Sequence, residues 1–158
     1  MAVFQRILCP VDFSEPSTKA LLFAERLVRE TSAEIILLHA FDVPAGYDAE
    51  GLQEPAEPGV KAQLERIKPM HPEIKVRRAL QAGPAGEVIC WFAEDQHCDL
   101  IVMGTHGRSG LRHMLLGSVA EHVIRHAHCP VLVVRDPPSD EPPPEKPKVL
   151  PLPPPQWM

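Results

Sequence analysis

Apolar residues along this chain form short runs separated by longer stretches of mixed character. Five runs predict β-strands, at residues 3–11, 34–40, 74–80, 99–103 and 130–134. The run at 34–40 is apolar without alternation, as expected for a strand that is covered on both faces. Residues 74–80 alternate between apolar and polar positions, which predicts a more exposed strand at an edge of the sheet.

The stretches between these runs predict helices. Ser14 is a good N-cap, and Pro16 fits the first helical turn, where its missing N–H costs nothing. Apolar residues then recur at helical spacing, so a helix is expected to about residue 30. Further helices are predicted at residues 60–70 (short at best), from Gly83-Pro84 to about residue 95, and from Gly117-Ser118 to about residue 125.

Strands that alternate with helices in this order predict a single α/β domain with a doubly wound, five-stranded parallel sheet and right-handed crossovers. In such sheets ligands bind beyond the carboxyl ends of the strands, where the strand order reverses. The globular domain is expected to span residues 1–135. Ten of the 23 residues at 136–158 are proline, which predicts a disordered or polyproline II tail, or alternatively a docking segment for an aromatic-lined groove.

Composition narrows the classes of partner. The formal net charge is -5, and the positive charges lie singly, so nucleic acid is not expected as a main partner. No segment has the roughly 18 apolar residues of a membrane span, and the first residues contain no signal-peptide core. The four cysteines form no C-x-x-C pair, and a cytoplasmic protein with reduced thiols is predicted. Cys9 and Cys129 are expected to be packing residues in strands.

Two loops that leave carboxyl strand ends carry unusual chemistry, residues 10–14 and the glycine-rich loop from Gly104 to Ser118. Gly104 and Gly107 are expected to take positive φ and to let the backbone approach a ligand. Successive N–H groups can then bind an anion. Gly117-Ser118 begins a helix, where free N–H groups favour phosphate. With His106 and Arg108 at the rim, the loop predicts a polyphosphate site.

Other motifs are incomplete. No G-K-[ST] follows Gly104, so the loop is not a Walker A sequence, and Leu111 breaks the nucleophile pattern G-x-S-x-G. His122 and His126 lie four residues apart, but Glu121 precedes His122, so H-E-x-x-H is absent. No metal site is predicted, and these histidines are interpreted as solvated side chains near a helix end.

The spacing of Gly104, Gly107, Gly117 and Ser118 fits G-x2-G-x9-G-[ST], and it resembles the nucleotide-binding signature of the universal stress protein family. Similar blocks lie at residues 7–17, 34–40, 99–111 and 115–134, in the family's order, so the resemblance covers nearly the whole globular part. It implies a Rossmann-like fold of the adenine nucleotide alpha hydrolase-like type. The Pro- and Gly-rich stretch at 41–59 departs from the family pattern and predicts a truncated second helix.

The resemblance also implies a binding site. Asp12 would face the adenine or ribose, Pro10 and Val11 would line the base pocket, and the Ala40 backbone would meet the adenine edge. Met103 and Gly104 would lie under the ribose and first phosphate. The phosphates would be surrounded by His106, Gly107, Arg108, Gly117, Ser118 and Val119, accompanied by Mg²⁺ with no protein carboxylate to hold it. The alternative for Asp12 is a turn or capping residue.

The expected function is a regulatory, stress-response protein that binds ATP or another adenine nucleotide, turns it over slowly or not at all, and is not an enzyme. It is expected to form a homodimer through residues 130–134. Two alternatives stay open: an interaction module that binds no nucleotide and acts through its dimer surface and Pro-rich tail, and a slow ATP hydrolase.

Overall fold

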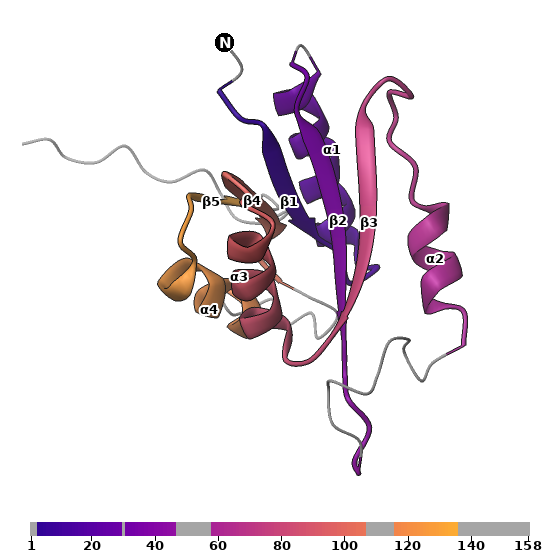
Figure 1. Cartoon of the computed structure of the whole chain (residues 1–158), viewed down its shortest axis with the longest axis vertical. Helices are drawn as coiled ribbons and strands as arrows, with labels where there is room; N and C mark the ends of the chain where they lie inside the picture. Colours follow the sequence, from indigo (N-terminus) through magenta and orange to yellow (C-terminus); the bar gives the residue numbers. More distant parts are fainter. Residues whose placement is uncertain (1–2, 30, 47–57, 107–115, 136–158) are drawn as a thin grey trace, which may run out of the picture.

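The computed structural model describes residues 3–29, 31–46, 58–106 and 116–135. Its five strands form one parallel sheet in the order β3-β2-β1-β4-β5 (Figure 1), which confirms the predicted fold class and the edge position of β3. The strands are β1 (Arg6–Pro10), β2 (Glu34–Phe41), β3 (Lys75–Ala82), β4 (Leu100–Gly104) and β5 (Val131–Val134).

Helices cover both faces of the sheet. They are α1 (Glu15–Val28), α2 (Val60–Arg66), α3 (Ala85–Asp95) and α4 (Ser118–His126). One core cluster joins α1 and α2 to alternate strand residues, among them Ile7, Ile35 and Leu37. The other joins α3 and α4 to the intervening residues, such as Leu8, Ile36 and Leu38. Burial on both faces explains why β2 shows no alternation in sequence.

Most element boundaries differ from the sequence prediction by a few residues, and the start of β1 differs for a clear reason. β1 begins at Arg6, because the N–H groups of Gln5 and Arg6 donate to the Asp99 carboxylate, at 2.8 and 3.2 Å, instead of continuing the ladder. The second helix has only seven residues, as its Pro- and Gly-rich approach predicted. The N-cap prediction for α1 is confirmed, since Oγ of Ser14 accepts a hydrogen bond from Ser17 N–H at 3.4 Å.

The strand order reverses between β1 and β4. β2 and β3 extend the sheet on one side of this pair, and β5 extends it on the other. The loops that leave β1 and β4 therefore diverge and open a crevice at the carboxyl edge, the usual ligand position in an open α/β sheet.

The Pro-rich tail at 136–158 lies outside the described residues, so the tail and the domain boundary at 135 stay predictions. Within the described ranges, no helix combines the length and apolar character needed to cross a membrane.

Candidate functional site

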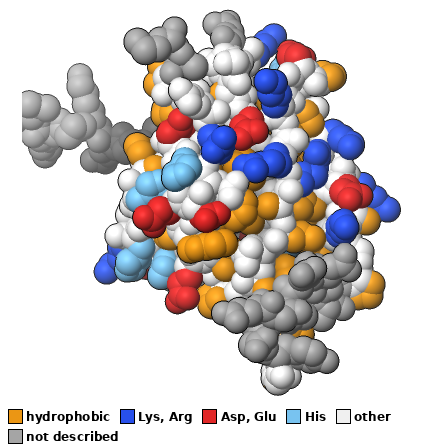
Figure 2. All heavy atoms as spheres, viewed as in Figure 1, with side chains coloured by type: hydrophobic (Ala, Val, Ile, Leu, Met, Phe, Trp, Pro, Cys, Tyr) orange, Lys and Arg blue, Asp and Glu red, His pale blue; other side chains and the backbone are white. Residues whose placement is uncertain are grey.

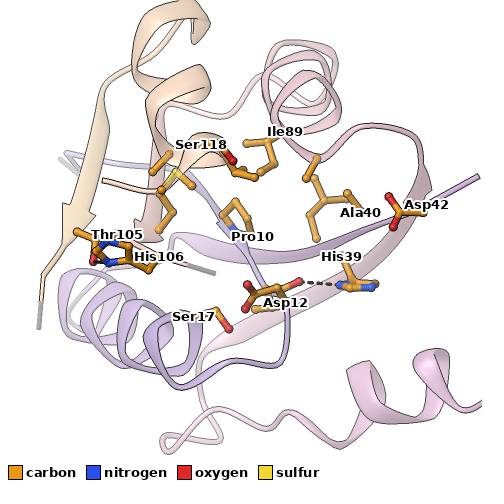
Figure 3. Close-up of a pocket in the computed structure, with 18 residues that line it drawn as sticks. Pro10, Asp12, Ser17, His39, Ala40, Asp42, Ile89, Thr105, His106 and Ser118 are labelled. Carbon is orange, nitrogen blue, oxygen red and sulfur yellow. Dashed lines mark hydrogen bonds between the residues drawn. The ribbon is translucent and has the colours of Figure 1, made fainter. Parts of the chain in front are cut away.

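A pocket of about 340 Å³ occupies the crevice at the carboxyl ends of β1, β2 and β4. Every predicted site residue that the structure describes lines it (Figure 3): Pro10, Val11, Asp12, Ala40, Met103, Gly104, His106, Gly117, Ser118 and Val119. Gly107 and Arg108 lie outside the described residues. The structure thus brings distant parts of the sequence together around one cavity, while the role of each residue in binding stays a prediction.

The loop after β1 is held by hydrogen bonds of its own. Oδ1 of Asp12 accepts from Ser14 N–H at 3.0 Å and also from the Ser14 hydroxyl. The carbonyl of Ser14 in turn accepts from the Ser17 hydroxyl at 3.0 Å. Asp12 is therefore a turn residue, as the alternative interpretation had it, and its half-buried side chain also lines the pocket.

Gly104, the last residue of β4, lies against the first turn of α1. A Cβ at this position would stand 2.8 Å from Cβ of Pro16 and 2.9 Å from its backbone carbon and oxygen. The expectation that Gly104 takes positive φ is wrong, because its φ lies outside that region. The sequence needs glycine here for close packing between the strand and the helix.

The two ends of the glycine-rich loop meet at the pocket. Gly117 N–H donates to the carbonyl of Thr105 at 2.6 Å. Nδ1 of His106 lies 3.1 Å from the Thr105 hydroxyl, and the Thr105 side chain is buried. This backbone hydrogen bond therefore fixes the start of α4 to the end of β4.

Two helices begin at the pocket without a side-chain cap. The N-cap residues of α3 and α4 are Pro84 and Gly117, and neither supplies a capping side chain. Ala85 and Ser118, which begin these helices, both line the cavity. Uncapped N–H groups and the positive ends of two helix dipoles make this side of the pocket suited to an anion.

The opposite side of the pocket is formed by the end of β2. Val11 N–H donates to the Leu38 carbonyl at 2.9 Å, and Gly83 N–H donates to the Phe41 carbonyl at 3.0 Å. In a parallel ladder alternate residues direct both backbone groups to the same neighbour. Ala40, two residues after Leu38, therefore directs its N–H and C=O toward β1, whose ladder with β2 ends at Pro10. These two groups face the crevice.

Sequence reasoning missed part of the lining, namely Ser17, Leu38, His39, Asp42, Ala85, Ile89, Thr105 and Ala120. Asp42 follows the carboxyl end of β2 just as Asp12 follows β1, so the rule that singled out Asp12 could have found it. Ala85 and Ile89 come from α3, whose small and apolar residues carry no distinctive signal. They give the pocket an apolar wall.

The histidines of α4 lie away from this pocket. His122 and His126 stack with ring centroids 4.3 Å apart, and Nδ1 of His126 lies 2.9 Å from the His122 carbonyl. Figure 2 shows histidine side chains gathered over this part of the surface, where His126 and His128 are exposed. In the described part of the chain, no group of three or more His, Cys, Asp or Glu side chains is arranged to hold a metal ion.

The cysteines are free thiols in apolar surroundings. Burial raises the pKa of Cys9 to about 12 and that of Cys98 to about 11, with smaller charge effects. Burial also raises the pKa of Cys90 and Cys129. Cys129 precedes β5 and is half-buried, so its predicted place in a strand is wrong, although it does pack against the core.

Comparison with known proteins shows which family this chain resembles. A model of the universal stress protein family matches residues 4–135. Universal stress protein MJ0531 of Methanocaldococcus jannaschii is 40% identical over 144 residues, which cover 85% of this chain and 84% of that protein.

Solved structures of universal stress proteins have the same fold as this chain. Universal stress protein UspA from Lactobacillus plantarum superposes with a TM-score of 0.71 at 25% identity, over 85% of this chain and 100% of that one. The universal stress protein from Archaeoglobus fulgidus in complex with dAMP superposes with a TM-score of 0.58 over 84% of this chain and 98% of that one. At 22% identity, this second likeness shows the fold alone.

Proposed function

The chain belongs to the universal stress protein family, and from this membership and the geometry of its pocket we propose that it binds an adenine nucleotide, with ATP as the expected form. The observation that carries the proposal is the polarity of the pocket. One side presents the open backbone edge of β2, and the other presents the uncapped starts of α3 and α4.

The base would bind at the edge of β2. Adenine presents an amino donor beside a ring-nitrogen acceptor, and the C=O and N–H of Ala40 form the complementary pair. Apolar residues at this end, including Leu38 and Ile89, would cover the flat faces of the ring. Asp12 lies between this edge and the loop after β4, where its carboxylate can accept hydrogen bonds from ribose hydroxyl groups.

The phosphates would lie toward α4, whose first N–H groups are uncapped and whose Ser118 hydroxyl adds a donor. Gly107 and Arg108 are proposed to complete this end. The Archaeoglobus fulgidus protein with dAMP carries an adenine nucleotide on the same fold, and the proposal for this chain rests on its own pocket. Mg²⁺ would accompany the phosphates and reduce the electrostatic repulsion between them.

Rapid turnover is not part of the proposal. Three of the polar side chains that line the pocket are tied to structural partners: Asp12 to Ser14, His39 to Val11, and His106 to Thr105. A general base must instead be positioned on an attacking water. A regulatory role follows, in which bound nucleotide stabilises one state of the protein. Slow hydrolysis of ATP is the second candidate, and steady release of phosphate above the rate in buffer would favour it.

A pocket-filling variant tests the proposal. Ala85→Phe places a ring in the cavity from the first position of α3, whereas Ala62→Phe adds the same ring to the exposed face of α2. Isothermal titration with ATP and Mg²⁺ is expected to show binding to the wild type and to Ala62→Phe, and a loss of at least about 100-fold for Ala85→Phe. Equal binding by all three proteins would place the nucleotide elsewhere. No binding by any of them would favour the interaction-module alternative.

We also propose a homodimer through β5. Ile101 N–H donates to the carbonyl of Pro130 at 3.0 Å, so Val131 and Val133 direct their backbone groups away from β4, to the outer edge. All four residues of β5 are apolar and only half-buried, and such an edge favours pairing with a second chain. Val133→Pro removes an outer N–H without removing a bond to β4. Sedimentation is expected to show a dimer for the wild type and a monomer for Val133→Pro, and a wild-type monomer would refute the dimer.

A further inference from the structure

His39 occupies an unusual position at the end of β2. The regular ladder between β1 and β2 would continue past the bond from Val11 N–H to Leu38 with a bond from Ala40 N–H to the Val11 carbonyl. Among the described residues that bond is not made. The Val11 carbonyl instead pairs with Nδ1 of His39 at 2.8 Å, the contact drawn as a dashed line in Figure 3.

This exchange has a consequence for Ala40. Nδ1 of His39 takes the place at the Val11 oxygen that the Ala40 N–H would occupy in the regular ladder, so this carbonyl is satisfied without the ladder bond. Because a carbonyl only accepts, Nδ1 of His39 must carry the proton in this contact. The N–H of Ala40 is left directed into the cavity, beside its own C=O.

The turn after β1 supports the same arrangement. Phe13 has φ of 64°, a left-handed conformation that is strained for an aromatic residue. Its ring lies 4.6 Å from the His39 ring at an interplanar angle of 40°. The turn therefore carries the chain away from β2 at the point where the ladder would have continued, while its side chain holds the imidazole in place. Strain of this kind persists only where the surrounding contacts enforce it.

We propose that His39 is a positioning residue of the nucleotide site, which takes the Val11 carbonyl and so keeps the Ala40 N–H free to bind the base. This rests on the proposed function as far as the ligand is concerned. The local claim, that His39 determines whether Ala40 N–H is free, stands on the ladder geometry and can be tested without any ligand.

Two substitutions separate this role from packing. His39→Asn keeps an N–H at the place of Nδ1, and His39→Leu keeps bulk against Phe13 but has no donor. In His39→Leu the Val11 carbonyl has lost its partner, so the Ala40 N–H is expected to close the ladder. His71→Leu is a matched control, since His71 is a half-buried histidine outside the pocket.

Amide hydrogen exchange of the full-length, nucleotide-free protein measures the local claim. Protection of the Ala40 amide is expected to rise about tenfold or more in His39→Leu, and to stay within about threefold of wild type in His39→Asn and His71→Leu. An Ala40 amide that is already protected in the wild type, or unchanged in His39→Leu, would overturn the inference.

Titration with ATP and Mg²⁺ measures the consequence for binding. His39→Leu is expected to weaken affinity about tenfold, and His39→Asn is expected to restore most of it. If the wild type binds nucleotide and His39→Leu binds equally well, the positioning role is refuted. If no protein binds nucleotide but Ala40 protection changes as described, the proposed function fails and the local role of His39 survives.

Discussion

Replacing Gly104 by alanine tests how the end of β4 is fitted to α1. The new Cβ would stand 2.8–2.9 Å from three atoms of Pro16, two of which belong to the backbone. Carbon atoms in relaxed contact are about 3.5–4.0 Å apart, so the strand and the helix would have to separate by roughly 0.6–1.2 Å. Neither element can shift without loss of stability, because Pro16 lies in the capped first turn of α1 and Gly104 ends a central strand.

Overpacking of this kind costs about 1–3 kcal/mol. For a domain of this size each kcal/mol lowers Tm by roughly 3–5 °C, so Gly104→Ala is expected to lower Tm by about 3–15 °C in thermal unfolding followed by circular dichroism. Gly104 lines the pocket, and so does Ser17, which follows Pro16 in α1. A separation of β4 from α1 should therefore also lower the affinity of the pocket for ATP. Gly46→Ala is the contrasting variant: no atom lies within 4 Å of the added Cβ, so any loss of stability there comes from the positive φ of 94° and not from packing. A Tm within about 1 °C of wild type for Gly104→Ala would refute the packing argument.

Three further predictions follow from the structure. A Cβ on Gly86 would lie 2.8 Å from the His122 ring, so Gly86→Ala should destabilise the wild type. In a His122→Ala background the ring is gone and only the Cβ of residue 122 stays close, at 3.0 Å. Gly86→Ala should therefore cost about 0.5–3 kcal/mol less there than in the wild type, and additive effects in chemical denaturation would contradict this. Ser14→Ala should cost about 1 kcal/mol by uncapping α1, whereas Thr18→Ala, one turn on and exposed, should cost less. Burial raises the pKa of Cys9 from 9.0 in the unfolded chain to about 12, so the folded state prefers the protonated thiol. Unfolding free energy should therefore fall as pH rises from about 9 toward 12, more steeply in the wild type than in Cys9→Ala, and parallel pH profiles would refute the assignment.

Much of the fold could be predicted from the sequence, because apolar runs and their spacing report burial directly. β2 is apolar at every position that packs against either helical layer, and β3 alternates because it lies at an edge. The start of β1 could not be predicted, since Val3 is 83% exposed and the Asp99 carboxylate, more than 90 residues away, takes the N–H groups that would have extended the strand.

The candidate site could be predicted where a residue type is distinctive for its position in the chain. Asp12 and the glycines stand out at strand ends, and a family resemblance supplied their order. The reason for Gly104 could not be read from the sequence, because its glycine is required by Pro16 in another element. His39 was missed for a related reason. In a strand it looks like one residue in an apolar run, and only the ladder register shows that its side chain replaces a backbone bond.

The central claim, that this chain holds an adenine nucleotide, is tested most directly by what the purified protein carries. Full-length protein is prepared without added nucleotide and denatured by heat, and the supernatant is analysed by ion-exchange chromatography with detection of adenine absorbance. We predict up to about one adenine nucleotide per chain, or, if the site empties during purification, saturable binding of added ATP with Mg²⁺ at that stoichiometry. Protein that carries no nucleotide and gives no titration heat with ATP and Mg²⁺ would contradict the account.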